Sequence, residues 1–131
     1  MNLIPFGVLF AALMPIACSG IAKTGKFGSP PEEGRFDNDL PREWLARQTG
    51  FRARANAAQA NCFEALPFFI GAVVIALQGG ASPERVQMLM LGWLLLRVAF
   101  VAFYLADRAT ARSLVWIGAL GFNIAILFSV A

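Results

Sequence analysis

Apolar residues gather into four long runs along the chain, separated by polar segments. The runs cover Leu3 to Ala22, Ala65 to Leu77, Val86 to Ala106, and Leu114 to Ala131. The first, third and fourth approach the about 20 residues that an α-helix needs to cross about 30 Å of hydrocarbon. The pattern therefore predicts an all-α integral membrane protein, built as a bundle of four transmembrane helices.

The second run is too short to cross a bilayer by itself. Its 13 apolar residues cover only about 20 Å at the rise of an α-helix. A spanning helix must therefore begin in the polar stretch before the run, which places Asn61 and Glu64 at membrane depth. Pro67 lies inside this helix and permits a kink. The predicted spans are residues 3–22, 54–77, 86–106 and 113–130 of a single domain, 1–131.

The polar segment between the first two spans, about residues 23–53, is rich in Gly, Pro and charge. Its first half reads as irregular, because the SPPEEG stretch breaks regular structure. Asn38 or Asp39 is expected to cap a helix that begins near Pro41, since Pro is tolerated in a first turn. We expect this helix to continue into the second span, with Gly50 as the place for a bend.

Basic residues are distributed unequally between the two sides of the predicted bundle. Nine of the 11 Lys and Arg residues lie in the first loop and at the turn between spans three and four, whereas the other side holds only Arg85. The positive-inside rule therefore places loops one and three in the cytoplasm and both chain ends outside. No basic residue precedes the first run, so we expect this segment to stay as a helix rather than act as a cleaved signal peptide.

Composition agrees with a small integral membrane protein, because 58% of the residues are hydrophobic and 15% are charged. A net charge of +3 with dispersed basic residues argues against a nucleic-acid partner. The chain has no His, so the commonest metal ligand is missing and no metal site is expected. Cys18 and Cys62 are expected as small buried residues, with a disulfide or a reactive thiol as alternatives.

Polar residues at membrane depth form a candidate site. Arg54, Asn61 and Glu64 share one helical stripe, and an ionisable group inside a span needs a partner. Glu64 and Arg97 lie about 20 and 17 Å from the outer ends of their helices, so we expect them close together. The result is a cavity that opens to the cytoplasm and suits an anionic ligand. Residues nearer the cytoplasm are Arg54, Asn61, Tyr104 and Arg112.

A structural role is the alternative for each of these residues. Glu64 and Arg97 can form a buried ion pair that only holds the bundle together, and Asn61 can join two helices. Tyr104 can belong to the aromatic belt at the membrane interface. The same belt, or simple packing, is the expected role of Trp44, Trp93 and Trp116.

The second span carries a recognisable motif, Arg-Ala-x-x-Ala-x-x-Asn-x-x-Glu-x-x-Pro-x-Phe, at residues 54–69. This motif resembles the signature of the MAPEG family, membrane-associated proteins of eicosanoid and glutathione metabolism. The stretch DNDLPREWLARQTGFRARA resembles the loop-to-helix entry of bacterial members. Arg97 is followed seven residues later by Tyr104, and then by Arg112 and Ser113. The resemblance covers nearly the whole chain.

The resemblance implies a four-helix subunit that forms a homotrimer, in a bacterial inner membrane, with glutathione as co-substrate between neighbouring subunits. By position, Asn61 and Glu64 match residues that hold the polar ends of glutathione, and Arg54, Arg97 and Tyr104 match residues that line its site. Arg112 matches the arginine that stabilises the glutathione thiolate. A guanidinium favours the thiolate and lowers the thiol pKa below its usual value of about 8.5.

The expected function is that of a glutathione-dependent transferase or peroxidase that acts on a lipophilic small molecule arriving from the membrane lipid. Two positions differ from the better-known members, since Ala57 and Phe100 stand where those carry Arg and Tyr. These differences favour an alternative, a non-catalytic MAPEG-like protein that binds a lipid or an anionic small molecule, or scaffolds a partner. A small transporter is a weaker alternative, because no continuous polar path crosses the predicted bundle.

Overall fold

The computed structural model describes residues 1–130 and is entirely helical in its regular elements. Four helices are long and apolar enough to cross a membrane, which confirms the predicted all-α, four-span architecture. Ala131, the last residue of the predicted domain, lies outside the described residues. The elements are α1 (Ile4–Lys23), the 3₁₀ helix η1 (Pro31–Glu33), α2 (Pro41–Ala46), α3 (Gly50–Gln78), α4 (Pro83–Leu105) and α5 (Ala109–Leu127).

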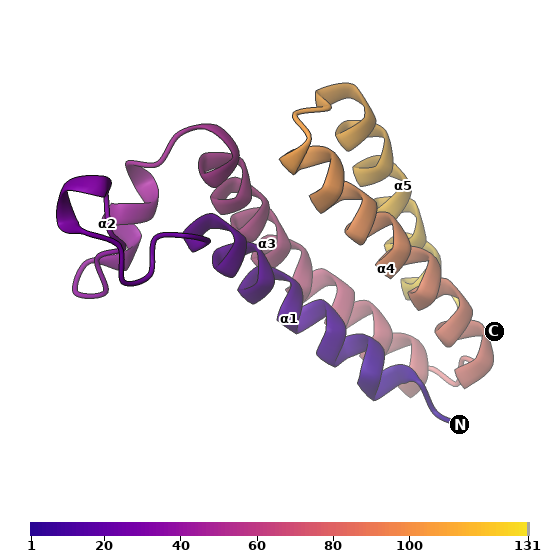
Figure 1. Cartoon of the computed structure of the whole chain (residues 1–131). Coiled ribbons are helices and arrows are strands. Elements are labelled where there is room, and N and C mark those ends of the chain that lie inside the picture. Colours follow the sequence, from indigo (N-terminus) through magenta and orange to yellow (C-terminus); the bar gives the residue numbers. More distant parts are fainter. Residues whose placement is uncertain (131) are drawn as a thin grey trace.

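The four long helices form two pairs, with α1 packed along α3 and α4 packed along α5 (Figure 1). Helix α3 also contacts α4 and α5, so it joins the two pairs. In Figure 1 the pairs lie close together at the end that carries both chain termini, and they diverge toward the α4–α5 turn. Both termini therefore lie at one end of the bundle.

Helix α3 has 29 residues and includes both the polar stretch and the apolar run that follows it. It continues unbroken through Pro67. At about 1.5 Å per residue its length is about 43 Å, which exceeds the about 30 Å of a hydrocarbon core. The excess places the first turns of α3 beside α2 and the long loop, while Asn61 lies within the bundle.

The expectation of one helix from Pro41 into the second span is wrong. Helix α2 ends at Ala46, and α3 begins only at Gly50. Gly50 has φ of 60°, a left-handed conformation that glycine adopts at little cost and that interrupts a right-handed helix. The chain therefore turns between the two helices instead of bending within one.

The start of α2 also differs from the expected cap. Leu40 is the N-cap residue, and no side chain caps the helix. Instead, the Asp37 carboxylate Oδ1 accepts the backbone N–H groups of Asp39 and Leu40, at 2.9 and 3.3 Å. This Asp turn fixes the chain just before the helix and replaces the cap expected from Asn38 or Asp39.

Glycines allow α4 and α5 to pack closely. A Cβ at Gly92 would lie 2.4 Å from Cε1 of the Phe122 ring, and one at Gly118 would lie 2.9 Å from Cδ1 of Leu96. Both distances are shorter than ordinary Cβ contacts, so a larger residue at either position would require the facing side chain to shift. On the other side of α4, the rings of Trp93 and Phe69 stack with centroids 3.9 Å apart. Helix α4 is thus fixed against α3 and α5.

Candidate functional site

Arg97 is the most buried charged residue of the bundle, with 2% of its surface exposed. Its Nη2 donates to Oδ1 of Asn61 at 2.9 Å and to Sγ of Cys62 at 3.6 Å. The guanidinium carbon also lies 4.4 Å from the ring centroid of Phe100. Hydrogen bonds and an aromatic face reduce the cost of burying this charge. Arg97 therefore ties α4 to α3 deep inside the bundle.

Glu64 is not the hydrogen-bond partner of Arg97 inside one subunit. The two residues line the same cavity, as their equal depth predicts, but within residues 1–130 no salt bridge of 4.0 Å or less joins them. Asn61, which lies three residues before Glu64 on α3, takes the acceptor position instead. The Glu64 side chain is exposed on the surface of the subunit.

A cavity of about 170 Å³ lies between α3, α4 and α5. Aromatic and small apolar side chains form most of its wall, and four polar side chains interrupt it. The polar residues are Asn61, Glu64, Arg97 and Asn123, and the aromatic ones are Phe68, Trp93 and Trp116.

A second cavity of about 450 Å³ lies nearer the α4–α5 turn. Arg112 lines it, with its guanidinium carbon 4.2 Å from the centroid of the Tyr104 ring. The ring face stabilises the cation and holds the long side chain against the wall. Asn61 and Trp116 line both cavities, so the two spaces adjoin and form one site with a cationic outer part.

Arg54 lies outside these two cavities. Its Nε donates to the backbone carbonyl of Leu105 at 3.1 Å, at the C-terminal end of α4 where carbonyls lack a partner within the helix. Five of the six predicted site residues thus line the adjoining cavities, whereas Arg54 connects α3 to α4. The five are Asn61, Glu64, Arg97, Tyr104 and Arg112.

Asn123 was not predicted as a site residue, and Trp93 and Trp116 were not expected to line the site. Asn123 is 4% exposed, and within residues 1–130 its Oδ1 has no hydrogen-bond partner. A signal was present, because Asn123 is the one carboxamide in the last apolar run. The two tryptophans gave no comparable signal, since aromatic residues are common in spans for packing alone.

The two cysteines are free and buried. They pack in one cluster with Met14 and Ala58, between α1 and α3, which agrees with their expected role as small buried residues. Within the part of the chain that the structure describes, no group of three or more His, Cys, Asp or Glu side chains is placed to hold a metal ion.

The fold and the site together define a four-helix integral membrane protein with a polar site inside the bundle. The model of the MAPEG family matches residues 4–131, nearly the whole chain, and the chain belongs to this family. Membership associates it with membrane-bound glutathione or eicosanoid metabolism. No curated protein and no solved structure matches the chain.

Proposed function

We propose that the protein is a glutathione-dependent membrane transferase or peroxidase that acts on a lipophilic electrophile. The proposal rests on the position of Arg112, which lines an open cavity of about 450 Å³ with its guanidinium beside the ring of Tyr104. A guanidinium at this place favours a thiolate over a thiol, because opposite charges attract. It acts electrostatically, since Arg does not lose its proton in proteins.

The remaining polar residues hold the peptide part of glutathione. Oδ1 of Asn61 accepts from Arg97, so the Asn61 amide N–H groups remain to donate to a carboxylate of glutathione. The Glu64 carboxylate accepts from the ammonium group at the other end of the peptide. Arg97 contributes indirectly, by orienting the Asn61 amide.

A neighbouring subunit completes the site in a homotrimer. Glu64 is exposed on the isolated subunit, although it belongs to a membrane-spanning helix. A carboxylate at this depth is unfavourable against lipid and faces protein or an aqueous cavity. We therefore place the subunit interface over Glu64, where it also encloses bound glutathione.

The second substrate reaches the thiolate from the lipid. Trp116 and Ile117 line the larger cavity and are 41% and 59% exposed on the outside of α5. These apolar side chains give a lipophilic molecule a lateral route into the site, while glutathione enters from the cytoplasmic end, where the positive-inside rule places Arg112.

Arg112→Ala tests the proposal. We expect turnover with glutathione and 1-chloro-2,4-dinitrobenzene to fall at least about 100-fold, the usual loss when one group that stabilises an anion is removed. The control is Arg108→Ala, which removes the same charge four residues earlier from an exposed position outside both cavities. Oligomer size is measured for both variants. Unchanged turnover by Arg112→Ala, in an intact oligomer, contradicts the proposed role.

A non-catalytic binding protein is the second candidate, and Phe100 favours it. Phe100 is buried beneath Arg97 and offers no hydroxyl to the larger cavity, which it lines. A thermal-shift titration of the purified protein with glutathione separates the two candidates, because a ligand that binds the native state raises its stability. The absence of a shift at millimolar glutathione favours the non-catalytic candidate.

A further inference from the structure

We propose that a groove between α1 and α4 binds one anionic phospholipid, with an acyl chain between the two helices and the phosphate on Arg54. The groove has a volume of about 290 Å³. It shares no lining residue with either cavity of the candidate site. The inference therefore goes beyond the proposed function and concerns a different surface of the subunit.

The groove is hydrophobic along its whole length. Its walls are formed by side chains from residues 10–21 of α1 and residues 98–105 of α4, and none of them is charged. The two helices belong to the pairs that diverge toward the α4–α5 turn (Figure 1). Ala17 and Ala102 are small and exposed, one on each wall. The groove is therefore hollow where a larger side chain from either helix would fill it.

The groove has the length of one acyl chain. Its walls extend over about 17 Å on α1 and about 11 Å on α4, and one leaflet contributes about 15 Å, half of the hydrocarbon core. Ile21 and Leu105 lie in the last turns of their helices, at the end that the positive-inside rule places at the cytoplasm. A chain that descends from the cytoplasmic headgroup layer thus fits the groove from end to end.

Arg54 supplies a positive charge at the cytoplasmic end of the groove. Its Nε donates to the backbone carbonyl of Leu105, which lines the groove. A guanidinium has five N–H donors, and its planar fork matches the oxygens of a phosphate. The side chain is only half-buried, so its other donors remain for a lipid phosphate at the membrane surface.

The subunit contact proposed over Glu64 leaves the groove uncovered. Cys18, which lines the groove, packs in one cluster with Ala58 and Cys62 of α3, so this face of α3 lies behind the groove. Glu64 follows Cys62 by two residues, which is a rotation of about 200° around the helix. Glu64 and the groove therefore face opposite directions, and lipid rather than a second copy of the chain covers the groove.

Native mass spectrometry of the full chain in detergent tests the headgroup contact. The probes are phosphatidylglycerol and phosphatidylcholine with identical acyl chains, added in equal amounts. We expect the wild type to retain phosphatidylglycerol about fivefold over phosphatidylcholine, the effect of one arginine beside an anionic headgroup. Arg54→Gln should reduce this ratio to about one. Arg52→Gln is the matched control, because Arg52 is also half-buried and donates to a carbonyl at a helix end, that of Ala22 in α1.

Ala102→Phe tests the groove itself, and it does so even if Arg54→Gln fails to fold. The new ring fills the groove from an exposed position and should remove one bound lipid per subunit. Ala125→Phe is the control, since Ala125 is an exposed alanine of α5 that does not line the groove. Oligomer size is measured for each variant in the same spectra.

Four results would overturn the proposal. They are equal retention of the two lipids by the wild type, a preference that survives Arg54→Gln, an unchanged lipid count in Ala102→Phe, and a smaller oligomer in Ala102→Phe alone. The last result would show that a second copy of the chain occupies the groove. The assay needs neither glutathione nor turnover, so its failure leaves the role of Arg112 untouched.

Discussion

Asn61 lies where the two cavities meet and where Arg97 finds its oxygen acceptor. Asn61→Leu should lower the free energy of unfolding by about 1.5–3 kcal/mol, the usual cost of losing a hydrogen bond to a charged group. Only the weak sulfur acceptor of Cys62 would then remain for the guanidinium. The measurement is denaturant-induced unfolding in detergent.

Asn61→Asp is the informative comparison, because a carboxylate of similar size keeps an acceptor opposite Arg97 and adds an opposite charge. We expect Asn61→Asp to be at least as stable as the wild type, whereas Asn61→Leu is less stable than the wild type. Equal stability of wild type and Asn61→Leu would show that the Arg97 contact is not part of what holds α3 to α4.

Arg97 bonds to Asn61 rather than to Glu64, and this choice could not be predicted from the sequence. The sequence predicted Glu64 and Arg97 at one depth, with Asn61 nearer the cytoplasm, and the structure brings all three residues to one cavity wall. Whether Asn61 or Glu64 reaches Arg97 depends on how α4 is rotated and shifted along α3. A shift of less than one helical turn is enough to exchange them. Packing contacts such as the stack of Phe69 on Trp93 set that register, and no pattern in the chain encodes it separately.

At the scale of the helices, the contact between α4 and α5 depends on Gly92. Gly92→Ala should destabilise the protein by about 1–3 kcal/mol, because a Cβ meets the Phe122 ring at 2.4 Å and the packed ring must shift to make room for it. Gly121→Ala is the control, since a Cβ there has nothing within 4 Å. Thermal unfolding in detergent measures both. Equal loss in the two variants would contradict a specific close contact at Gly92.

The lengths of the helices could be predicted from the sequence wherever an apolar run determines the length of a membrane span. The short second run required a helix that begins in polar sequence, and α3 indeed extends from Gly50 to Gln78. The break between α2 and α3 was missed, because the residues from Pro41 onward favour a helix, whereas α2 ends at Ala46, Thr49 is extended and Gly50 has a positive φ. Glycine is compatible with both a helix and a left-handed turn, so its choice depends on how α2 packs.

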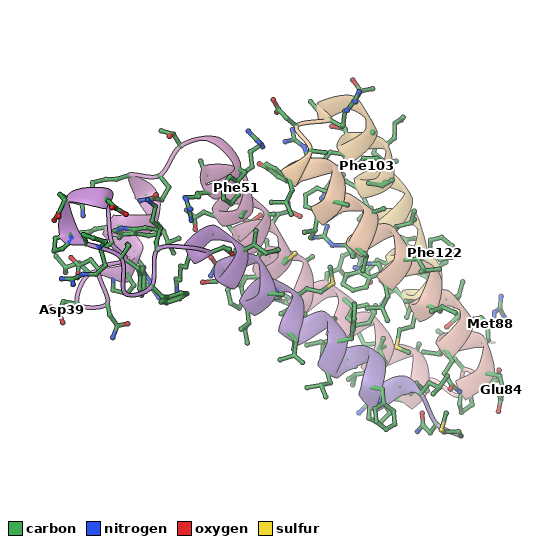
Figure 2. The ribbon with its side chains drawn as sticks, viewed as in Figure 1. Asp39, Phe51, Glu84, Met88, Phe103 and Phe122 are labelled. Atoms are coloured by element: carbon green, nitrogen blue, oxygen red, sulfur yellow. The ribbon has the colours of Figure 1, made fainter. Side chains whose placement is uncertain are left out.

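At the scale of the whole molecule, both termini lie at one end of the bundle, and Glu84 and Asp39 lie toward opposite ends (Figure 2). The positive-inside rule predicts that the long loop faces the cytoplasm. Glu32→Cys should therefore react with a membrane-impermeant maleimide only in inverted vesicles, and Glu84→Cys only in intact cells. Both positions are exposed, and the native cysteines are buried, which keeps background labelling low. The reverse labelling pattern would invert the topology.

The architecture of the whole molecule was predictable because the bilayer dictates the length of apolar segments. The assembly of subunits was harder to predict from the sequence. Large apolar side chains such as Leu13, Leu91 and Leu95 are exposed on the subunit, and lipid and a neighbouring subunit solvate such surfaces equally well. Glu64 is the exception, because its charge distinguishes the two environments, and for this reason the proposed subunit contact is placed there.

We expect Arg97 also to affect how the chain enters the bilayer during synthesis. An arginine at the centre of a span costs about 2.5–3.5 kcal/mol on the insertion scale, although the rest of α4 is strongly apolar. Its acceptor Asn61 belongs to the preceding span, joined to α4 by the short link 79–82. Helices α3 and α4 can therefore leave the translocon as a hairpin. The order of the chain provides a partner for Arg97 before the arginine meets lipid.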